Sequence, residues 1–178
     1  MLQWQWQCTH TRNNLPEITY AASLAFHRLL SPMERMNLWD VDLTSVPAEH
    51  LASLASSVTE VIDIRNVCGC GLVTILDSVK SKELWIRRSF SSEETRALVQ
   101  AMESRVERIV LHSESTLDLR FLHEYNGQGK CREVRCRSYR IDRYREQLRT
   151  WAMSRNWAVT RDNRLHIYLQ LKDLNTDE

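Results

Sequence analysis

The chain has 178 residues, and its 24 lysines and arginines nearly balance its 23 aspartates and glutamates. Hydrophobic residues make up 43% and charged residues 26%, which is the balance of an ordinary globular domain, and the length allows a single domain, 1–178, with a sizeable core. With only 4 glycines and 3 prolines, the composition excludes collagen-like, linker-rich and low-complexity chains.

The first residues, MLQWQWQCTHTR, have no apolar core of signal-peptide length and no small-residue cleavage site. No stretch of the chain approaches the roughly 18–20 apolar residues that span a membrane. We therefore expect a soluble, cytoplasmic protein with no membrane partner. The cysteines are odd in number, and no small secreted scaffold surrounds them, so they are expected to be free thiols: Cys8, Cys68, Cys70, Cys131 and Cys136.

Residues 14–31 predict an N-terminal capping helix. Asn14 and Glu17 have the spacing that starts a helix, and four apolar residues then share one face: Ile18, Ala22, Ala25 and Leu29. Such a helix would cover one end of whatever structure follows.

A pair of apolar residues, with one residue between its members, recurs five times within 35–156. The pairs are Met36/Leu38, Ile62/Ile64, Leu84/Ile86, Ile109/Leu111 and Val134/Cys136. Their second members lie 26, 22, 25 and 25 residues apart, which falls in the range of about 20–29 residues typical of leucine-rich repeats. Each pair is predicted to be the buried side of a short strand.

A helical pattern of apolar residues follows each pair. The apolar stripes are Leu51, Leu54 and Val58; Leu72, Ile75, Leu76 and Val79; Leu98, Ala101, Met102 and Val106; a weaker set of Leu117, Leu122 and Tyr125; and Ile141, Tyr144, Leu148 and Trp151. Ser91 and Glu94 have the capping-box spacing that starts the third helix, and Asn126-Gly127 can end the fourth.

The repeating unit is therefore strand, turn and helix. A single unit cannot bury both its strand and its helix, whereas parallel stacking of neighbouring units buries both. The expected fold class is α/β: a short leucine-rich-repeat-like solenoid of about five β-turn-α units, with a parallel sheet and terminal caps. Residues 157–178 are expected to provide the C-terminal cap, as two closing strands with a turn at Asp162-Asn163, followed by a solvated tail.

The repeats LASLASSV and RALVQAMESRV, behind DIRNV and LWIRR, resemble the ribonuclease-inhibitor-like leucine-rich repeats of NOD-like immune receptors. The resemblance covers about Arg35 to Asn156. It implies a recognition module, not an enzyme, with a role in innate immunity.

The stretch VCGCG at 67–71 places two cysteines one residue apart. Structural zinc sites pair cysteines two to four residues apart, so Cys68 and Cys70 would need Cys131 and Cys136 close in space to complete four ligands. Cys136 holds an inward strand position, which argues against that cluster. We interpret Cys68 and Cys70 as reduced turn residues and expect no metal and no cofactor.

Three common enzyme motifs are absent from the sequence, although a catalytic site can also be assembled in space from residues without such a motif. The chain has no Gly-x-Ser-x-Gly, no His-Glu-x-x-His and no Walker loop, and GQGK at 127–130 is better explained as a helix stop than as a phosphate cradle. His27 and His50 lie on or beside predicted helices and are interpreted as solvated. We therefore expect no enzymatic activity.

Alternation along the strands places two rows of side chains on the sheet surface opposite the apolar pairs. The middle residues of the pairs form one row, which is Asn37, Asp63, Trp85, Val110 and Arg135; the residues after the pairs form the other, which is Trp39, Arg65, Arg87, His112 and Arg137. Arginine and tryptophan are frequent energetic anchors of protein interfaces. The candidate binding residues are Trp39, Arg65, Trp85, Arg87, His112, Arg135 and Arg137, although arginine can also serve simply to keep a sheet face soluble.

The segment 130–164 is basic, with eleven arginine and lysine residues against four acidic residues. Such a block can bind nucleic acid or another polyanion through counterion release, or it can be a solvated end cap with intrahelical charge pairs. We expect a protein partner, bound through the sheet face, and keep nucleic acid or polyanion binding through 130–164 as the alternative.

Overall fold

The computed structural model describes residues 4–6, 33–67, 71–113 and 117–172. Three sequence-based predictions lie outside these residues: the capping helix at 14–31, the turn role of Cys68 and Cys70, and the solvated tail.

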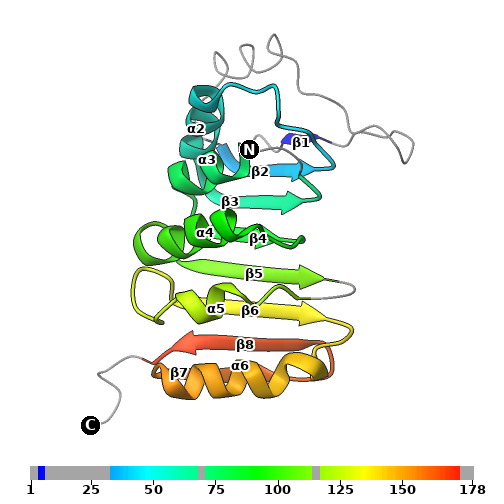
Figure 1. The fold of residues 1–178 in the computed structure, drawn as a ribbon, viewed down its shortest axis with the longest axis vertical. Coiled ribbons are helices and arrows are strands. Elements are labelled where there is room, and N and C mark those ends of the chain that lie inside the picture. Colours follow the sequence, from blue (N-terminus) through cyan, green and yellow to red (C-terminus); the bar gives the residue numbers. More distant parts are fainter. Residues whose placement is uncertain (1–3, 7–32, 68–70, 114–116, 173–178) are drawn as a thin grey trace.

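The strands form one mixed, mostly parallel sheet in the order β1-β2-β3-β4-β5-β6-β8-β7 (Figure 1). Strands β1 to β6 run parallel, and β8 is antiparallel to both β6 and β7. Their bounds are β1 Trp4–Trp6, β2 Met33–Trp39, β3 Val58–Arg65, β4 Glu83–Ile86, β5 Arg108–Ser113, β6 Glu133–Ser138, β7 Trp157–Asp162 and β8 His166–Leu171.

Helices alternate with the strands. Their bounds are α2 Ala48–Ser57, α3 Gly71–Ser78, α4 Ser92–Ser104, α5 Phe121–Glu124 and α6 Asp142–Ser154. Helices α2 to α5 contact one another in chain order, and α6 packs on β7 and β8 at the C-terminal end of the sheet (Figure 1). The α/β class with alternating strands and helices is confirmed. The fourth helix has a single turn, in agreement with its weaker apolar stripe.

The inward side of the sheet is the apolar side predicted from the residue pairs. Met36 pairs with Ile62, Ile62 with Leu84, Leu84 with Ile109, and Ile109 with Val134. All of these side chains are buried in one core with the apolar stripes of the helices. The spacings of 26, 22, 25 and 25 residues in the sequence therefore separate residues that pair with each other across neighbouring parallel strands.

The C-terminal end is closed by the two strands expected there. Strand β8 pairs with β6 and places Ile167 and Leu169 in the core, so that the last parallel strand has no open edge. The turn lies at Asn163, whose amide donates to the carbonyl of His166.

Strand β1, WQW at Trp4–Trp6, pairs in parallel with β2 and was not predicted from the sequence. Its period-2 alternation was the available signal, but three residues are too few to predict a strand with no known neighbour. Among the described helices, none is both long enough and apolar enough to cross a bilayer.

Candidate functional site

The strand register confirms the predicted rows. Asn37, Asp63, Trp85, Val110 and Arg135 are direct neighbours across β2 to β6. In the second row, Trp39 lies beside Arg65 and His112 lies beside Arg137. The backbone amide of Arg87 donates a hydrogen bond to the Ile64 carbonyl, which continues the pairing of β3 with β4 by one residue. We name the sheet surface opposite the described helices the outer face.

The outer face also carries a third row of side chains, which was not predicted from the sequence. It comprises Arg35, Val61, Glu83, Arg108 and Glu133, each directly before an apolar pair, and the same two-residue period could have found it. Its charged members hold the predicted residues in place.

The first part of the outer face is a cluster around Asp63, which is fully buried although it is a carboxylate. Arg87 Nη2 lies 3.1 Å and Arg35 Nη2 3.5 Å from Asp63 Oδ2. The Arg35 guanidinium lies 4.8 Å from the ring centre of Trp85, and that of Arg87 lies 5.7 Å from the ring centres of both Trp85 and Trp39. Ion pairs and cation–π contacts therefore fix two arginines and two tryptophans together.

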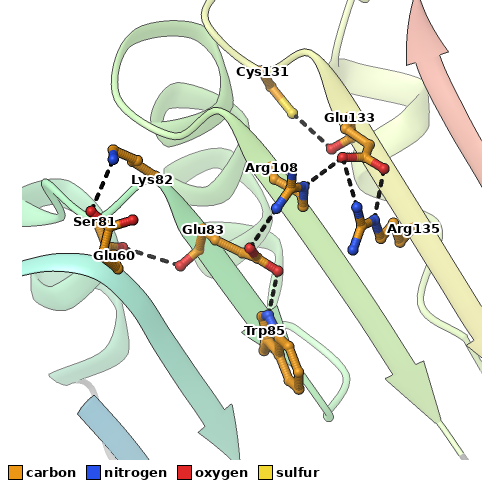
Figure 2. A network of polar contacts seen from close by, with 9 residues as sticks. All are labelled: Glu60, Ser81, Lys82, Glu83, Trp85, Arg108, Cys131, Glu133 and Arg135. Carbon is orange, nitrogen blue, oxygen red and sulfur yellow. Dashed lines mark hydrogen bonds and ion pairs between the residues drawn. The ribbon is translucent and has the colours of Figure 1, made fainter. Parts of the chain in front are cut away.

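The second part is a ladder of alternating charges across β4, β5 and β6 (Figure 2). Trp85 Nε1 donates to Glu83 at 2.5 Å, and Arg108 bridges Glu83 at 2.8 Å and Glu133 at 2.5 Å. Arg135 then donates to Glu133 at 2.7 Å and 3.2 Å. The ladder joins Trp85 to Arg135, so these two candidate residues belong to one network.

Ionisation within the ladder follows from these contacts. Burial alone would raise the pKa of Glu133, but the hydrogen bonds from Arg135 and Arg108 outweigh burial and lower that pKa. Burial alone would likewise lower the pKa of Arg108, and its bonds to Glu133 and Glu83 raise it instead. Both shifts favour the charged forms of Glu133 and Arg108.

The third part of the outer face lies on β8 and β7. The guanidinium groups of Arg135 and Arg161 lie 5.2 Å and 5.3 Å from the ring centre of Tyr168, and His166 meets the same ring edge-on. Burial, together with Arg137 and Arg161, lowers the pKa of His166. These contacts extend the arginine–aromatic pattern to the closing strands.

The candidate residues therefore differ in the contacts that they already make. Arg87, Trp85 and Arg135 are engaged in the network, whereas Arg65 and Arg137 are exposed and form no ion pair within the described part of the chain. Trp39 is half-buried, and its indole N–H is buried without a hydrogen-bond partner among the described residues. His112 is half-buried and already has a partner.

The outer face carries a positive charge. Its described arginines are Arg35, Arg65, Arg87, Arg108, Arg135, Arg137 and Arg161, and its described carboxylates are Asp63, Glu83 and Glu133. All three carboxylates are paired with arginines. Among the described residues, the guanidinium groups of the outer face therefore outnumber the carboxylates that could neutralise them.

The basic segment 130–164 does not form one surface. Arg135, Arg137 and Arg161 contribute to the outer face, whereas Arg145 and Arg149 pair with Asp162 on the side of the sheet that α6 covers. The arginine count of the segment thus overstates the charge available to a single polyanion.

The predictions about the cysteines and His50 concern residues that do not belong to the three rows of the outer face. Cys131 and Cys136 are buried free thiols, and within the described residues no group of three or more histidine, cysteine or acidic side chains could hold a metal ion. The interpretation of His50 as solvated was wrong, because the side chain is buried on α2 and has a partner.

Comparison with protein-family models, with curated proteins and with solved structures finds no significant match, so the function must be argued from the outer face itself.

Proposed function

We propose that this chain is a non-enzymatic recognition module that binds a protein partner through the outer face of its sheet. The observation that carries the proposal is the continuous arginine–aromatic network, which runs from Trp39 on β2 to Tyr168 on β8. Its side chains are held by ion pairs, so little conformational entropy would be lost when a partner binds.

The chemistry of the face favours an acidic protein surface. Tryptophan, tyrosine and arginine are the residue types that most often carry binding energy at protein interfaces. The arginines outnumber the carboxylates, which are already paired. Acidic side chains of a partner could therefore pair with Arg65 and Arg137, which form no ion pair with another described residue.

We also propose that the five β-turn-α units form a short leucine-rich-repeat-like solenoid. Support comes from the parallel order of β2 to β6 and from the repeating pairing of equivalent apolar residues. Solenoids commonly present the sheet side of their repeats for binding. The resemblance of the repeats to those of NOD-like receptors is the reason to look for the partner in innate immunity.

The test removes free charge from the outer face without disturbing the network. The full chain, its Arg65→Ala/Arg137→Ala variant and an Arg96→Ala/Arg143→Ala control, whose exposed arginines lie on α4 and α6, are immobilised at equal density and exposed to native extract. We expect proteins retained by the wild type and the control to be depleted at least about tenfold on the outer-face variant. Equal retention on all three surfaces would contradict the proposal.

A heparin column separates this proposal from the polyanion alternative. Because arginines of the segment 130–164 lie on different surfaces, we expect the wild type to elute at low salt. Elution only at high salt, with a steep dependence of retention on salt concentration, would favour nucleic acid or another polyanion as the ligand.

A further inference from the structure

A cavity of about 330 Å³ lies near the C-terminal end of the fold, and no residue of the outer face lines it. Three segments meet there: the loop before β6, the connection between α6 and β7, and the end of β8. The described lining residues are Gly127, Gln128, Gly129, Arg132, Arg155, Asn156, Leu171 and Lys172. Three of them are cationic and none is acidic.

The loop that forms one wall has a defined shape. Gly127 and Gly129 have φ values of 83° and 133°, which side chains rarely adopt, and a Cβ at Gly129 would lie 2.6 Å from the backbone of Glu103. The Gly127 carbonyl accepts a 2.8 Å hydrogen bond from Trp157 Nε1, and the Lys130 amide donates to the Glu103 carbonyl. The wall is therefore anchored at both ends.

The cations of the cavity differ in how they are held. Arg155 is fixed, because its Nε donates to the Tyr125 carbonyl and its guanidinium lies 5.3 Å from the ring centre of Trp151. Arg132 and Lys172 are exposed, and neither side chain forms an ion pair within the described part of the chain. One positioned guanidinium and two further cations thus face a space in which the described lining residues include no carboxylate.

A larger cavity of about 580 Å³ lies near the ends of α2 and α3, and it also has basic lining residues, including Lys80 and Arg105. It also contains the exposed carboxylate of Asp77, whereas the described residues that line the smaller cavity include no acidic residue. The smaller cavity is therefore the better anion site.

We propose that the cavity beside Gly127–Gly129 binds the phosphate group of a small phosphorylated molecule. Guanidinium and ammonium groups form short, charge-assisted hydrogen bonds with phosphate oxygens, and Asn156 can add an amide donor. The proposal is independent of protein binding at the outer face, because the two sites share no residue.

The site contains its own spectroscopic reporter. The indole N–H of Trp157 donates to the Gly127 carbonyl, whereas that of Trp85 lies on the outer face and donates to Glu83. In proton–nitrogen NMR spectra of the full chain, titration with inorganic phosphate and with O-phosphoserine, at constant ionic strength, should shift the Trp157 indole and the Gly127 and Gly129 amides. The Trp85 indole signal should stay in place. The stronger of the two ligands distinguishes free phosphate from a phosphate ester.

The Arg132→Gln/Lys172→Gln variant should weaken phosphate binding at least about tenfold, because it removes two charged donors. The Arg143→Gln control removes an exposed arginine outside the cavity and should leave binding unchanged. No saturable shift at Trp157 with either ligand would overturn the proposal, as would equal weakening in the control. Unchanged chemical shifts elsewhere in the variant's spectrum would show that it remains folded.

Discussion

Individual charged residues on the outer face differ in what they do for the fold. Asp63 is fully buried, and its charge is compensated by Arg87 and by the more distant Arg35. Removing one partner of a buried ion pair is costly because the remaining charge keeps its desolvation penalty. Arg65 lies beside this cluster and is exposed and unpaired among the described residues. Mutation of Arg87 and mutation of Arg65 should therefore change the free energy of unfolding by very different amounts.

We predict that Arg87→Ala lowers the free energy of unfolding by about 2 kcal/mol, because Asp63 loses its closer partner and two rings lose a cation–π contact. The matched change Arg65→Ala should cost less than about 0.5 kcal/mol. Urea denaturation of both variants measures the difference. Equal costs would show that Asp63 does not depend on Arg87.

Among the helices, α4 has the best-defined start. The Ser91 hydroxyl accepts from the Glu94 amide at 3.1 Å, and Glu94 accepts in return from the Ser91 amide at 2.7 Å. Glu94 also pairs with Arg88 at 3.0 Å, which links the helix start to the segment after β4. The predicted capping box is therefore confirmed, and it positions the helix that packs against α3 and α5.

We predict that Ser91→Ala lowers stability by about 1 kcal/mol, because the Glu94 amide loses its acceptor. Ser92→Ala, at the first helical position, is the control and should have little effect. Thermal denaturation followed by circular dichroism compares the two variants. A loss of stability in Ser92→Ala as large as that in Ser91→Ala would argue against the cap as the cause.

At the scale of the whole molecule, the core contains acidic groups that are neutral in the folded state. Burial raises the pKa of the Cys131 and Cys136 thiols to about 12, and burial also raises the pKa of the Tyr125 hydroxyl. In the unfolded chain these thiols ionise near pH 9. Between about pH 9 and 12 the unfolded state therefore binds fewer protons than the folded state, and stability must fall as pH rises.

We predict that the free energy of unfolding is insensitive to these thiols below about pH 8. Above about pH 9, each thiol should lower it by about 1.4 kcal/mol per pH unit. Urea midpoints at pH 8 and pH 10 measure the loss. The Cys131→Ala/Cys136→Ala variant, compared with its own value at pH 8, should lose less. An identical loss in the variant would show that other groups cause the alkaline sensitivity.

The α/β class, the apolar pairs of β2 to β6, the closing strands and the two predicted rows of the outer face could all be predicted from the sequence. These features depend on local periodicity, which is two residues in a strand and 3.6 residues in a helix. The pattern repeats along the chain, and equivalent residues of successive repeats pair across neighbouring strands. The capping box was predictable for the same reason, because its two residues lie three positions apart.

Which of the described arginines form ion pairs depends on the three-dimensional arrangement of the strands and cannot be read from the sequence. Asp63 lies 24 residues from Arg87, and Arg108 lies 25 from both Glu83 and Glu133, so these charges meet only when parallel strands stand side by side. Stacking likewise divided the basic segment 130–164 between surfaces and brought Arg132, Arg155 and Lys172 around one cavity. A charge count along the chain cannot show this, because pairing between charges depends on their distances in space.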